Sequence, residues 1–239
     1  MDLLFPPKCP LCEEPLPLRE RGKKKMRQRR ESMEGEREGF CKECAAKVEY
    51  AGMVYDAKAD SASNVPKHSF EAAYAVFKYA SIAKAVYRLK YQGKVAYGRT
   101  LGKIMWQKAS SVLKEWEPDC ILPVPLHENR KKKRGFNQSK VLSEALSEGL
   151  GIPIFPEMVL RCRDTKPMRN LNARERQNNL KKAFKIGQND VKLKTIQIVD
   201  DIYTTGATTD EISRLLLEAG ASKTYVLTLG SDTEDVSAW

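Results

Sequence analysis

The stretch Ile196–Thr208 constrains the fold of this chain more than any other part of its sequence. It begins as an apolar strand that ends in two adjacent carboxylates, Asp200 and Asp201, and it continues into a loop rich in threonine and glycine. A helix is expected to start at Thr208, with Glu211 three residues further on to complete a capping box. The sequence therefore predicts a strand, a tight loop and a helix in direct succession.

The loop between this strand and this helix has the chemistry of an anion site. Backbone N–H groups, threonine hydroxyls and the positive end of the helix dipole are all expected to face its concavity. No lysine follows the glycine, which excludes a Walker A loop. Two carboxylates beside such a cradle suit a ribose 5-phosphate, with the sugar hydroxyls or Mg²⁺ at the acids and the phosphate in the loop.

Strand and helix patterns alternate from residue 69 onwards. The expected strands are 73–79, 120–125, 195–201 and 225–229. The expected helices are 81–91, 101–116, 139–150 and 208–219. This alternation predicts an α/β domain with a mainly parallel sheet.

Composition and the first residues narrow the class of protein. Apolar residues make up 41% of the chain and charged residues 31%, which is typical of a globular protein. No apolar run reaches the roughly 18 residues of a membrane-spanning helix. The segment Met1–Pro7 has no basic region and too short an apolar stretch for a signal peptide. We therefore expect a cytoplasmic protein with no stable membrane insertion.

Four of the six cysteines form two closely spaced pairs, Cys9 with Cys12 and Cys41 with Cys44. Two such pairs supply four thiolates to one tetrahedral Zn²⁺, and a reducing compartment disfavours disulfides. A redox pair or unrelated thiols are the alternative. The isolated Cys120 lies in an apolar run and is expected in the core.

The residues between the two pairs hold a dense basic run and few large apolar side chains, so they cannot bury a core of their own. The sequence predicts a four-cysteine zinc-finger module with a basic insertion over residues 1–55. A linker is expected over 56–68, and the α/β domain over 69–239.

Positive charge gathers in three windows, Arg19–Arg30, Arg130–Arg134 and Arg161–Lys185, within a chain whose formal net charge is +11. A solvated surface is the simplest interpretation of any one window. The three windows together favour a polyanionic partner.

The segment Ile196–Thr208 resembles the signature of type I phosphoribosyltransferases, which bind phosphoribosyl pyrophosphate (PRPP). The resemblance implies their fold, a mainly parallel twisted sheet flanked by helices. It also implies that Asp200 and Asp201 face the ribose hydroxyls and Mg²⁺. The residues that it assigns to the 5-phosphate are Thr204, Thr205, Gly206, Ala207 and Thr208.

A second series of motifs narrows the family. It comprises Leu89–Tyr91, Gly93, Pro123–His127, Arg130, Arg134–Gln138, Glu175–Arg176, Asn179–Leu180 and Ala183–Phe184. Together with the cysteine pairs, and over nearly the whole chain, this series resembles the ComF family of bacterial competence proteins, which includes ComFC and has GntX as a relative. The resemblance implies a zinc finger joined to a phosphoribosyltransferase-like domain and a part in the uptake of transforming DNA. Met168 departs from the glutamine that is frequent in the family, and the spacer between the cysteine pairs is long and basic.

Further polar residues are candidates for PRPP binding. Arg134, Asn137 and Gln138 follow a strand end, where ligands of α/β proteins bind, and Arg134 is placed to clamp pyrophosphate. Lys90 has the same expected role from a helix end, and Arg176 from a loop that closes over the ligand. A solvated cation is the alternative for Arg134 and Lys90.

Three functions stay open. The favoured one is a DNA-uptake factor that binds PRPP with Mg²⁺, holds single-stranded DNA and works with other cytoplasmic uptake proteins. The others are a phosphoribosyltransferase that joins PRPP to a base, and a non-catalytic sensor or assembly protein. No aromatic cluster follows Tyr225 to form a hood for a base, although transfer itself needs mainly charge stabilisation. The cations expected to contact DNA phosphates are Lys23, Lys24, Lys25, Arg27, Arg29, Arg30, Arg130, Lys131, Lys132 and Lys133.

Overall fold

The structure is a computed structural model that describes residues 6–16, 39–58, 67–163, 183–187, 192 and 194–233. Some residues singled out in the sequence lie outside this part of the chain, namely Lys23, Lys24, Lys25, Arg27, Arg29, Arg30, Met168, Glu175, Arg176, Asn179 and Leu180. Among the helices that the structure describes, none is long and apolar enough to cross a membrane.

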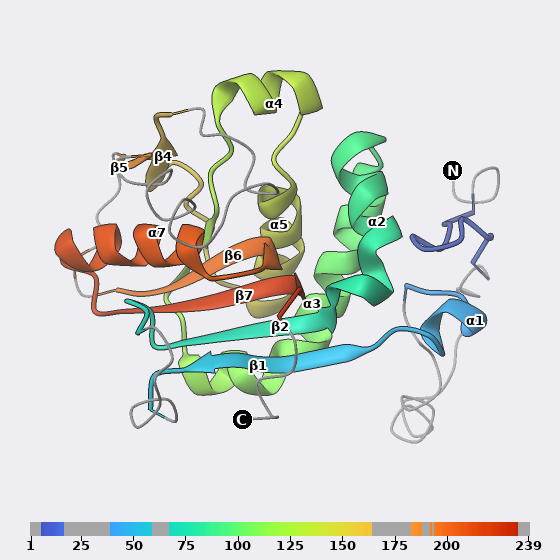
Figure 1. The fold of residues 1–239 in the computed structure, drawn as a ribbon, viewed down its shortest axis with the longest axis horizontal. Coiled ribbons are helices and arrows are strands. Elements are labelled where there is room, and N and C mark those ends of the chain that lie inside the picture. Colours follow the sequence, from blue (N-terminus) through green and yellow to red (C-terminus); the bar gives the residue numbers. More distant parts are fainter. Residues whose placement is uncertain are drawn as a thin grey trace.

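A five-stranded sheet with the order β1-β2-β7-β6-β3 runs through the larger domain (Figure 1). Its strands are β1 (Tyr50–Asp56), β2 (Ala72–Lys78), β3 (Cys120–Pro123), β6 (Thr195–Tyr203) and β7 (Lys223–Ser231). Strands β2, β7, β6 and β3 are parallel, and β1 lies antiparallel to β2 at one edge. A separate hairpin pairs β4 (Val159–Arg161) with β5 (Phe184–Ile186).

The helices in the described part of the chain are α1 (Lys42–Ala45), α2 (Tyr79–Tyr91), α3 (Val95–Trp116), α4 (Glu128–Arg134), α5 (Gln138–Leu150) and α7 (Ala207–Glu218). Helices α2, α3, α5 and α7 pack on the two faces of this sheet, whereas α1 lies in the cysteine module and α4 lies beyond the sheet. α3 and α5 pack together over one face, and α7 packs over the other. Strand β3 shows the alternation that feeds both layers, because Cys120 and Leu122 join the cluster on the α7 side and Ile121 joins the cluster on the α3 side.

The predicted fold class is confirmed. Each strand and helix expected in the larger domain is present. The largest shift is in α3, which begins at Val95 rather than at residue 101 because its first turns are also buried, at Tyr97 and Gly98. Cys120 lies in the core, as expected, with no exposed surface.

Strand β1 crosses the predicted boundary between the zinc module and the linker. Its residues, Tyr50–Asp56, were assigned to the module and the start of the linker, but they pair with β2. The module also packs on the larger domain, since Cys9, Phe40 and Val48 are buried in the same apolar cluster as Phe77 of β2. The two parts therefore share one core rather than meeting only through a tether.

The basic run at residues 130–134 forms most of a helix, α4, which the sequence did not predict. His127 caps it, with Nδ1 accepting a hydrogen bond from the backbone N–H of Asn129 at 3.3 Å, and Gly135 ends it with φ +84°. Four cations in the last turns of α4 suit the negative end of the helix dipole.

The predicted start of α7 is wrong. The helix begins at Ala207, its N-cap residue is Gly206 and no side chain caps it, so the expected capping box of Thr208 and Glu211 does not form. The physical reason is that β6 extends to Tyr203, which leaves only three residues for the turn into the helix. Glu211 instead pairs with Arg214 at 2.9 Å.

Candidate functional site

Asp200 lies near the carboxyl end of β6 and is held by two hydrogen bonds. Its Oδ1 accepts from Ser139 Oγ at 2.9 Å and from the backbone N–H of Asp201 at 2.8 Å. Burial and the adjacent Asp201 carboxylate raise the pKa of Asp200 to about 7. Ser139, in the first turn of α5, was not singled out from the sequence. It ties the segment after β3 to the acids of β6.

Asp201 is buried and forms an ion pair with the ammonium group of Lys90 near the end of α2. Burial alone would lower the pKa of Lys90, but the Asp201 carboxylate raises it above its ordinary value. Asp200 acts on the Lys90 ammonium in the same direction, and Arg134 opposes both. Lys90, Arg134 and the two acids therefore form one electrostatic group.

The loop after β6 wraps a small hollow at the start of α7. Gly206 is buried with φ +69°, and a Cβ there would lie 2.8 Å from Tyr203 Oη and 2.9 Å from His68 Cε1. Only glycine fits this position. The hollow is lined by Asp200, Ile202, Tyr203, Thr204, Thr205, Gly206, Ala207, Thr208 and Thr209, a set that includes every residue assigned to the 5-phosphate.

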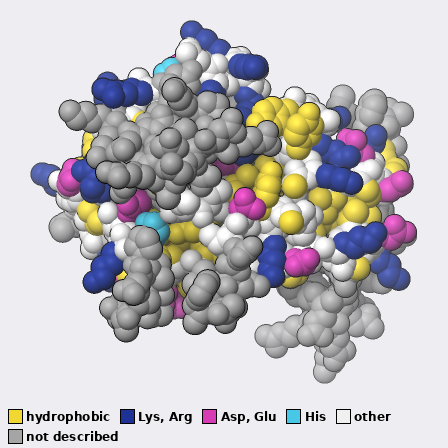
Figure 2. Space-filling view, in the orientation of Figure 1, with side chains coloured by type: hydrophobic (Ala, Val, Ile, Leu, Met, Phe, Trp, Pro, Cys, Tyr) yellow, Lys and Arg dark blue, Asp and Glu magenta, His cyan; other side chains and the backbone are white. Residues whose placement is uncertain are grey.

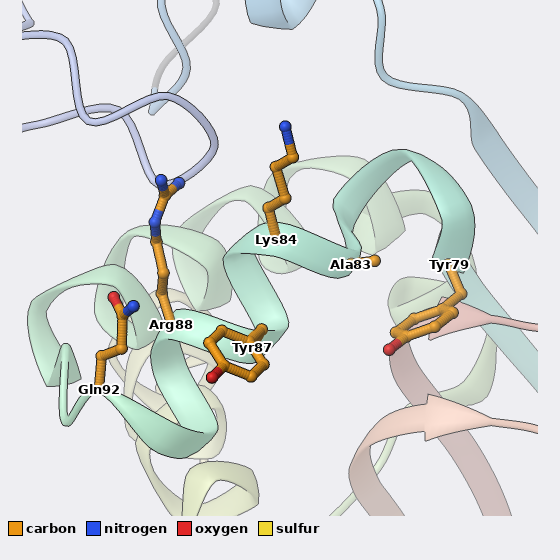
Figure 3. A pocket seen from close by; sticks show the side chains of 6 residues that line it. All are labelled: Tyr79, Ala83, Lys84, Tyr87, Arg88 and Gln92. Carbon is orange, nitrogen blue, oxygen red and sulfur yellow. The ribbon is translucent and has the colours of Figure 1, made fainter.

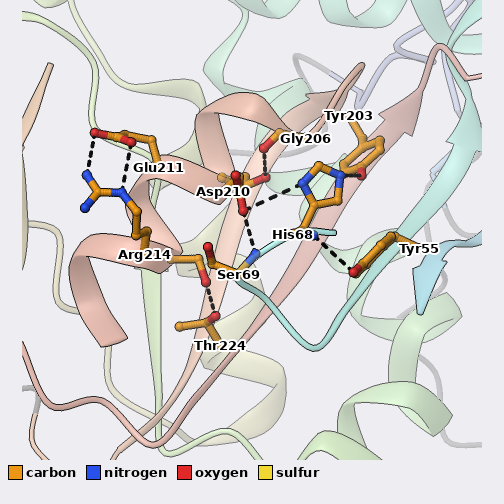
Figure 4. Close-up of polar contacts among 11 residues, drawn as sticks. Tyr55, His68, Ser69, Tyr203, Gly206, Asp210, Glu211, Arg214 and Thr224 are labelled. Carbon is orange, nitrogen blue, oxygen red and sulfur yellow. Dashed lines mark hydrogen bonds and ion pairs between the residues drawn. The ribbon is translucent and has the colours of Figure 1, made fainter. Parts of the chain in front are cut away.

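A polar cluster supports this loop from behind (Figure 4). His68 Nε2 lies 3.3 Å from Tyr203 Oη, and His68 Nδ1 lies 3.7 Å from Asp210 Oδ1 in the first turn of α7. The same Asp210 oxygen accepts a hydrogen bond from the backbone N–H of Ser69 at 2.6 Å. Burial would raise the pKa of Asp210, but its bonds to His68 and Ser69 bring it below its ordinary value.

No local pattern in the sequence indicates this cluster. The predicted linker includes His68, so the sequence assigns that residue no role. The cluster also joins Ser69 to Asp210, and these two residues are far apart along the chain. Only the packing of the segment before β2 against α7 reveals the contact. The cluster fixes the position of Gly206, because His68 and Tyr203 both touch the space that a Cβ would fill.

Arg134, Asn137 and Gln138 lie together between α4 and α5. Arg134 donates a hydrogen bond to the Gln138 side-chain oxygen, and its guanidinium carbon lies 5.7 Å from the centre of the Tyr91 ring. Asn137 caps α5, accepting from the backbone N–H of Ser139 at 3.1 Å and donating to the carbonyl of Val124 at 2.9 Å. Asn137 thus shapes the site by joining the end of β3 to the start of α5.

The candidate DNA contacts that the structure describes lie on α4 rather than in the hollow at α7. Lys131, Lys132 and Lys133 are exposed, and Arg130 is half-buried. Lys131 lies 3.7 Å from Glu128 one turn earlier, a weak surface pair. These side chains present a cationic surface beside the site that holds Arg134.

The four cysteines of the two pairs come together as predicted. All four sulfur atoms lie within 4.8 Å of one another, and those of Cys12 and Cys41 are 3.5 Å apart. A tetrahedral Zn²⁺ with Zn–S bonds of about 2.3 Å needs sulfur atoms roughly 3.8 Å apart, so the cluster fits a zinc ion. The backbone N–H of Cys44 lowers the pKa of Cys41, whereas burial raises the pKa of Cys12.

The first cysteine knuckle is docked on α2 and α3. Arg88 donates hydrogen bonds to the backbone carbonyls of Pro10 at 2.9 Å and Leu11 at 2.5 Å. Glu13 pairs with Arg88 at 3.4 Å and accepts from Tyr97 Oη at 3.1 Å. Helix α2 therefore carries both the contact to the cysteine module and the lysine that pairs with the acids of β6.

Curated proteins include clear relatives of this chain, although no family model matches it. Competence protein F of Haemophilus influenzae is 35% identical over 59% of this chain and 64% of its own length. Competence protein ComFC of Streptococcus pneumoniae is 33% identical over 64% of this chain and 66% of its own. DNA utilization protein YhgH of Escherichia coli K12 is 44% identical over 46% of this chain and 48% of its own length.

Solved structures also match, at low similarity. Glutamine PRPP amidotransferase from B. subtilis is 20% identical with a TM-score of 0.37, and it covers 55% of this chain and 25% of its own. A purine phosphoribosyltransferase from Pyrococcus horikoshii is 18% identical with a TM-score of 0.37. The match covers 55% of this chain and 73% of that protein. Likenesses of this size carry no argument about ligands, and the fold class rests on the sheet and its helices.

The sheet, the strand–loop–helix hollow and the cysteine cluster define an α/β protein with an attached four-thiol module. The curated relatives, at 33–44% identity, support a place for the chain in the ComF/ComFC family, as the resemblance in the sequence implied. It spans about half to two thirds of the length of the curated relatives that it matches.

Proposed function

We propose that this protein is a competence-associated DNA-uptake factor that binds PRPP with Mg²⁺ and holds single-stranded DNA in the cytoplasm. The observation that carries the PRPP site is the hollow at the start of α7. It places the Asp200 carboxylate of β6 beside a loop in which the space next to Gly206 has no room for a side chain, while Asp201 lies next in the strand and pairs with Lys90. A phosphate fits that loop because backbone N–H groups at a helix start attract anions.

The acids of β6 are the proposed ligands of Mg²⁺. Oxygen ligands are the ones that Mg²⁺ prefers, and it usually takes one or two carboxylates together with substrate phosphates. Bound Mg²⁺ would offset the charges of the pyrophosphate. Lys90 already neutralises Asp201, so the ammonium and the metal compete for that carboxylate. Arg134 supplies a further cation to the same electrostatic group.

Isothermal calorimetry with PRPP and Mg²⁺ tests the site. Gly206→Ala should weaken PRPP binding roughly 10- to 100-fold, because a displaced loop loses at least one charge-assisted contact. Gly151→Ala is the matched control, since Gly151 has a similar φ of +73° but nothing within 4 Å of the added Cβ. Equal PRPP affinity in the wild type and Gly206→Ala would refute the placement.

Single-stranded DNA is the proposed polyanion, and α4 is the described part of its binding surface. Lysine and arginine reach phosphates rather than base edges, so this contact is independent of sequence. The basic run before Arg30 and the zinc module are proposed to extend it. A role with other cytoplasmic uptake proteins is proposed on the names of the relatives.

Neutralising Lys131, Lys132 and Lys133 to glutamine should flatten the salt dependence of DNA binding. Each phosphate neutralised on a single strand contributes a slope of about −0.7 to the plot of log affinity against log salt. The triple variant should therefore lose up to about two units of slope and keep its PRPP affinity. The control variant replaces three exposed lysines of α3 with glutamine, so its net charge equals that of the α4 variant. An equal change of slope in both variants would show a general charge effect and contradict the surface. The control lysines are Lys103, Lys108 and Lys114, all exposed.

The enzymatic alternative has a separate readout. A phosphoribosyltransferase releases pyrophosphate when PRPP, Mg²⁺ and its acceptor are mixed. Incubation with each nucleobase or with single-stranded DNA, followed by a pyrophosphate assay, distinguishes transfer from binding alone.

A further inference from the structure

Helix α2 exposes two tyrosine rings that its packing does not need. Tyr87 is 57% exposed and Tyr91 is 68% exposed, and their ring centres lie 5.2 Å apart at 43°. The buried side of the same helix is made by smaller side chains, including Ile82, Val86 and Leu89. The two rings lie one helical turn apart on the outer side, where they form a continuous aromatic surface.

Cations flank this surface. Arg134 of α4 lies with its guanidinium carbon 5.7 Å from the centre of the Tyr91 ring. Figure 2 shows hydrophobic side chains gathered over the end of α2, with Lys and Arg on both sides of them. The α4 cations behind Arg134 are Arg130, Lys131, Lys132 and Lys133.

A pocket opens on α2 beside Tyr87, with a volume of about 360 Å³ (Figure 3). Tyr79 and Tyr87 contribute aromatic side chains to its lining, and Lys84 brings a positive charge, whereas the Arg88 guanidinium in the lining is bound to the first cysteine knuckle and pairs with Glu13. The lining is completed by Ala83 and Gln92. Aromatic faces, cations and a shallow hollow thus occur together on one helix.

We propose that Tyr87 and Tyr91 form a stacking site for bases of single-stranded nucleic acid, with α4 holding the adjoining phosphates. This inference rests on the proposed binding of single-stranded DNA and names the side chains that contact its bases. Every base has a π face, so stacking on tyrosine tolerates any sequence, and a cationic track beside aromatic rings is the usual design of single-strand sites. A duplex keeps its bases stacked inside and cannot offer them to the rings.

The charge around the rings favours a nucleic acid over a protein helix or a second copy of this chain. An apolar protein surface would cover the tyrosines but would bring no negative charge to the cationic surface of α4 beside them. A strand supplies a base for the ring and a phosphate for the cation within one nucleotide. Lys90 lies between the two tyrosines in the sequence and pairs with Asp201, so the stacking site adjoins the proposed PRPP site.

Fluorescence anisotropy with two labelled oligonucleotides of equal length and charge tests the proposal. One is an oligothymidylate and the other is an abasic phosphodiester strand. The wild type should bind the thymidylate about 10- to 100-fold more tightly, which is the worth of one or two stacked bases. Tyr87→Ala with Tyr91→Ala should reduce thymidylate binding to the abasic level, and Tyr87→Phe with Tyr91→Phe should keep the preference. The salt slope should be equal in all three proteins, because the phosphate contacts remain.

The outcomes separate the two levels of the proposal. Equal wild-type affinity for both strands overturns the stacking site and leaves DNA binding intact. No affinity for either strand overturns the proposed DNA function and the stacking site with it. Analytical sedimentation compares the oligomeric states of the wild type and the alanine variant. A dimeric wild type and a monomeric variant would assign the rings to a contact between copies and overturn the proposal. Both rings are exposed, so the thermal unfolding of the variants should match that of the wild type.

Discussion

The variant Cys41→Ser is expected to contain no zinc, whereas the wild type contains one Zn²⁺ per chain. A serine hydroxyl does not replace a thiolate ligand, and zinc binding supplies about 10–16 kcal/mol to the folding of comparable zinc-finger peptides. Apart from the metal, the module is held by a small set of contacts, chiefly the burial of Cys9, Phe40 and Val48 and the bonds of Arg88 to the first knuckle. Loss of the metal should therefore unfold the module and leave the α/β domain folded.

Elemental analysis and hydrogen exchange check this result together. Cys162→Ser is the matched control, because Cys162 is exposed and lies outside the cysteine cluster, and it should keep its zinc. Exchange should rise in residues 6–16 and 39–48 of Cys41→Ser and stay low in β6 and β7. A metal-free wild type with slow exchange in those two segments would contradict the prediction.

The parts of the site that the sequence predicted are those that depend on local pattern. The strand β6, the loop before α7 and the two cysteine knuckles each need only neighbouring residues, so spacing and residue type were enough. Gly206 illustrates this, because a glycine between a strand and a helix already indicates a turn that other residues cannot make.

The parts that the sequence did not predict depend on contacts between distant segments. Strand β1 lies at the edge of the sheet, and its residues do not alternate regularly between buried and exposed. Only its pairing with β2 identifies it as a strand. His68 reaches Asp210 through the packing of the segment before β2 on α7. Lys90 was expected to bind pyrophosphate, but its ion pair with Asp201 follows from where α2 ends, which no local motif encodes.

The variant Asp200→Asn is expected to lose the tight binding of PRPP with Mg²⁺ and yet to unfold less readily than the wild type above neutral pH. Asparagine keeps the size of the side chain and removes the charge that Mg²⁺ needs. Affinity should fall about 100-fold or more, since a charge-assisted contact and a metal ligand are lost together. Calorimetry with PRPP and Mg²⁺ measures the loss of affinity. Urea unfolding, with neither Mg²⁺ nor chelator added, measures the change in stability.

The sign of the stability effect follows from the pKa of Asp200. In the folded protein it is raised to about 7 by burial and by Asp201, whereas in the unfolded chain it is about 3.9. The folded state therefore binds more protons between these values, and its stability falls as pH rises through that window. Above pH 7 the cost is complete. Asp200→Asn carries no such cost, so its advantage should appear above about pH 4 and level off above about pH 7.

Asp210→Asn is the control of opposite sign. The pKa of Asp210 is lowered in the folded state by His68 and Ser69, against the effect of burial. Its stabilising effect is present above the unfolded pKa and is lost as pH falls through the folded pKa, so Asp210→Asn should be less stable than the wild type at neutral pH. The same pH dependence in both variants would refute the assignment of charges.

A carboxylate that weakens the fold at working pH needs a compensating partner. Within the described site Lys90 is that partner for Asp201, and Ser139 gives Asp200 only a hydrogen bond. A cation bound with PRPP would stabilise the ionised Asp200, and the affinity of the wild type for Mg²⁺ and PRPP should therefore rise between pH 6 and pH 8. Asp200→Asn should show a smaller rise, because only the phosphates of the ligand, with a second pKa of about 6, still lose protons in this range.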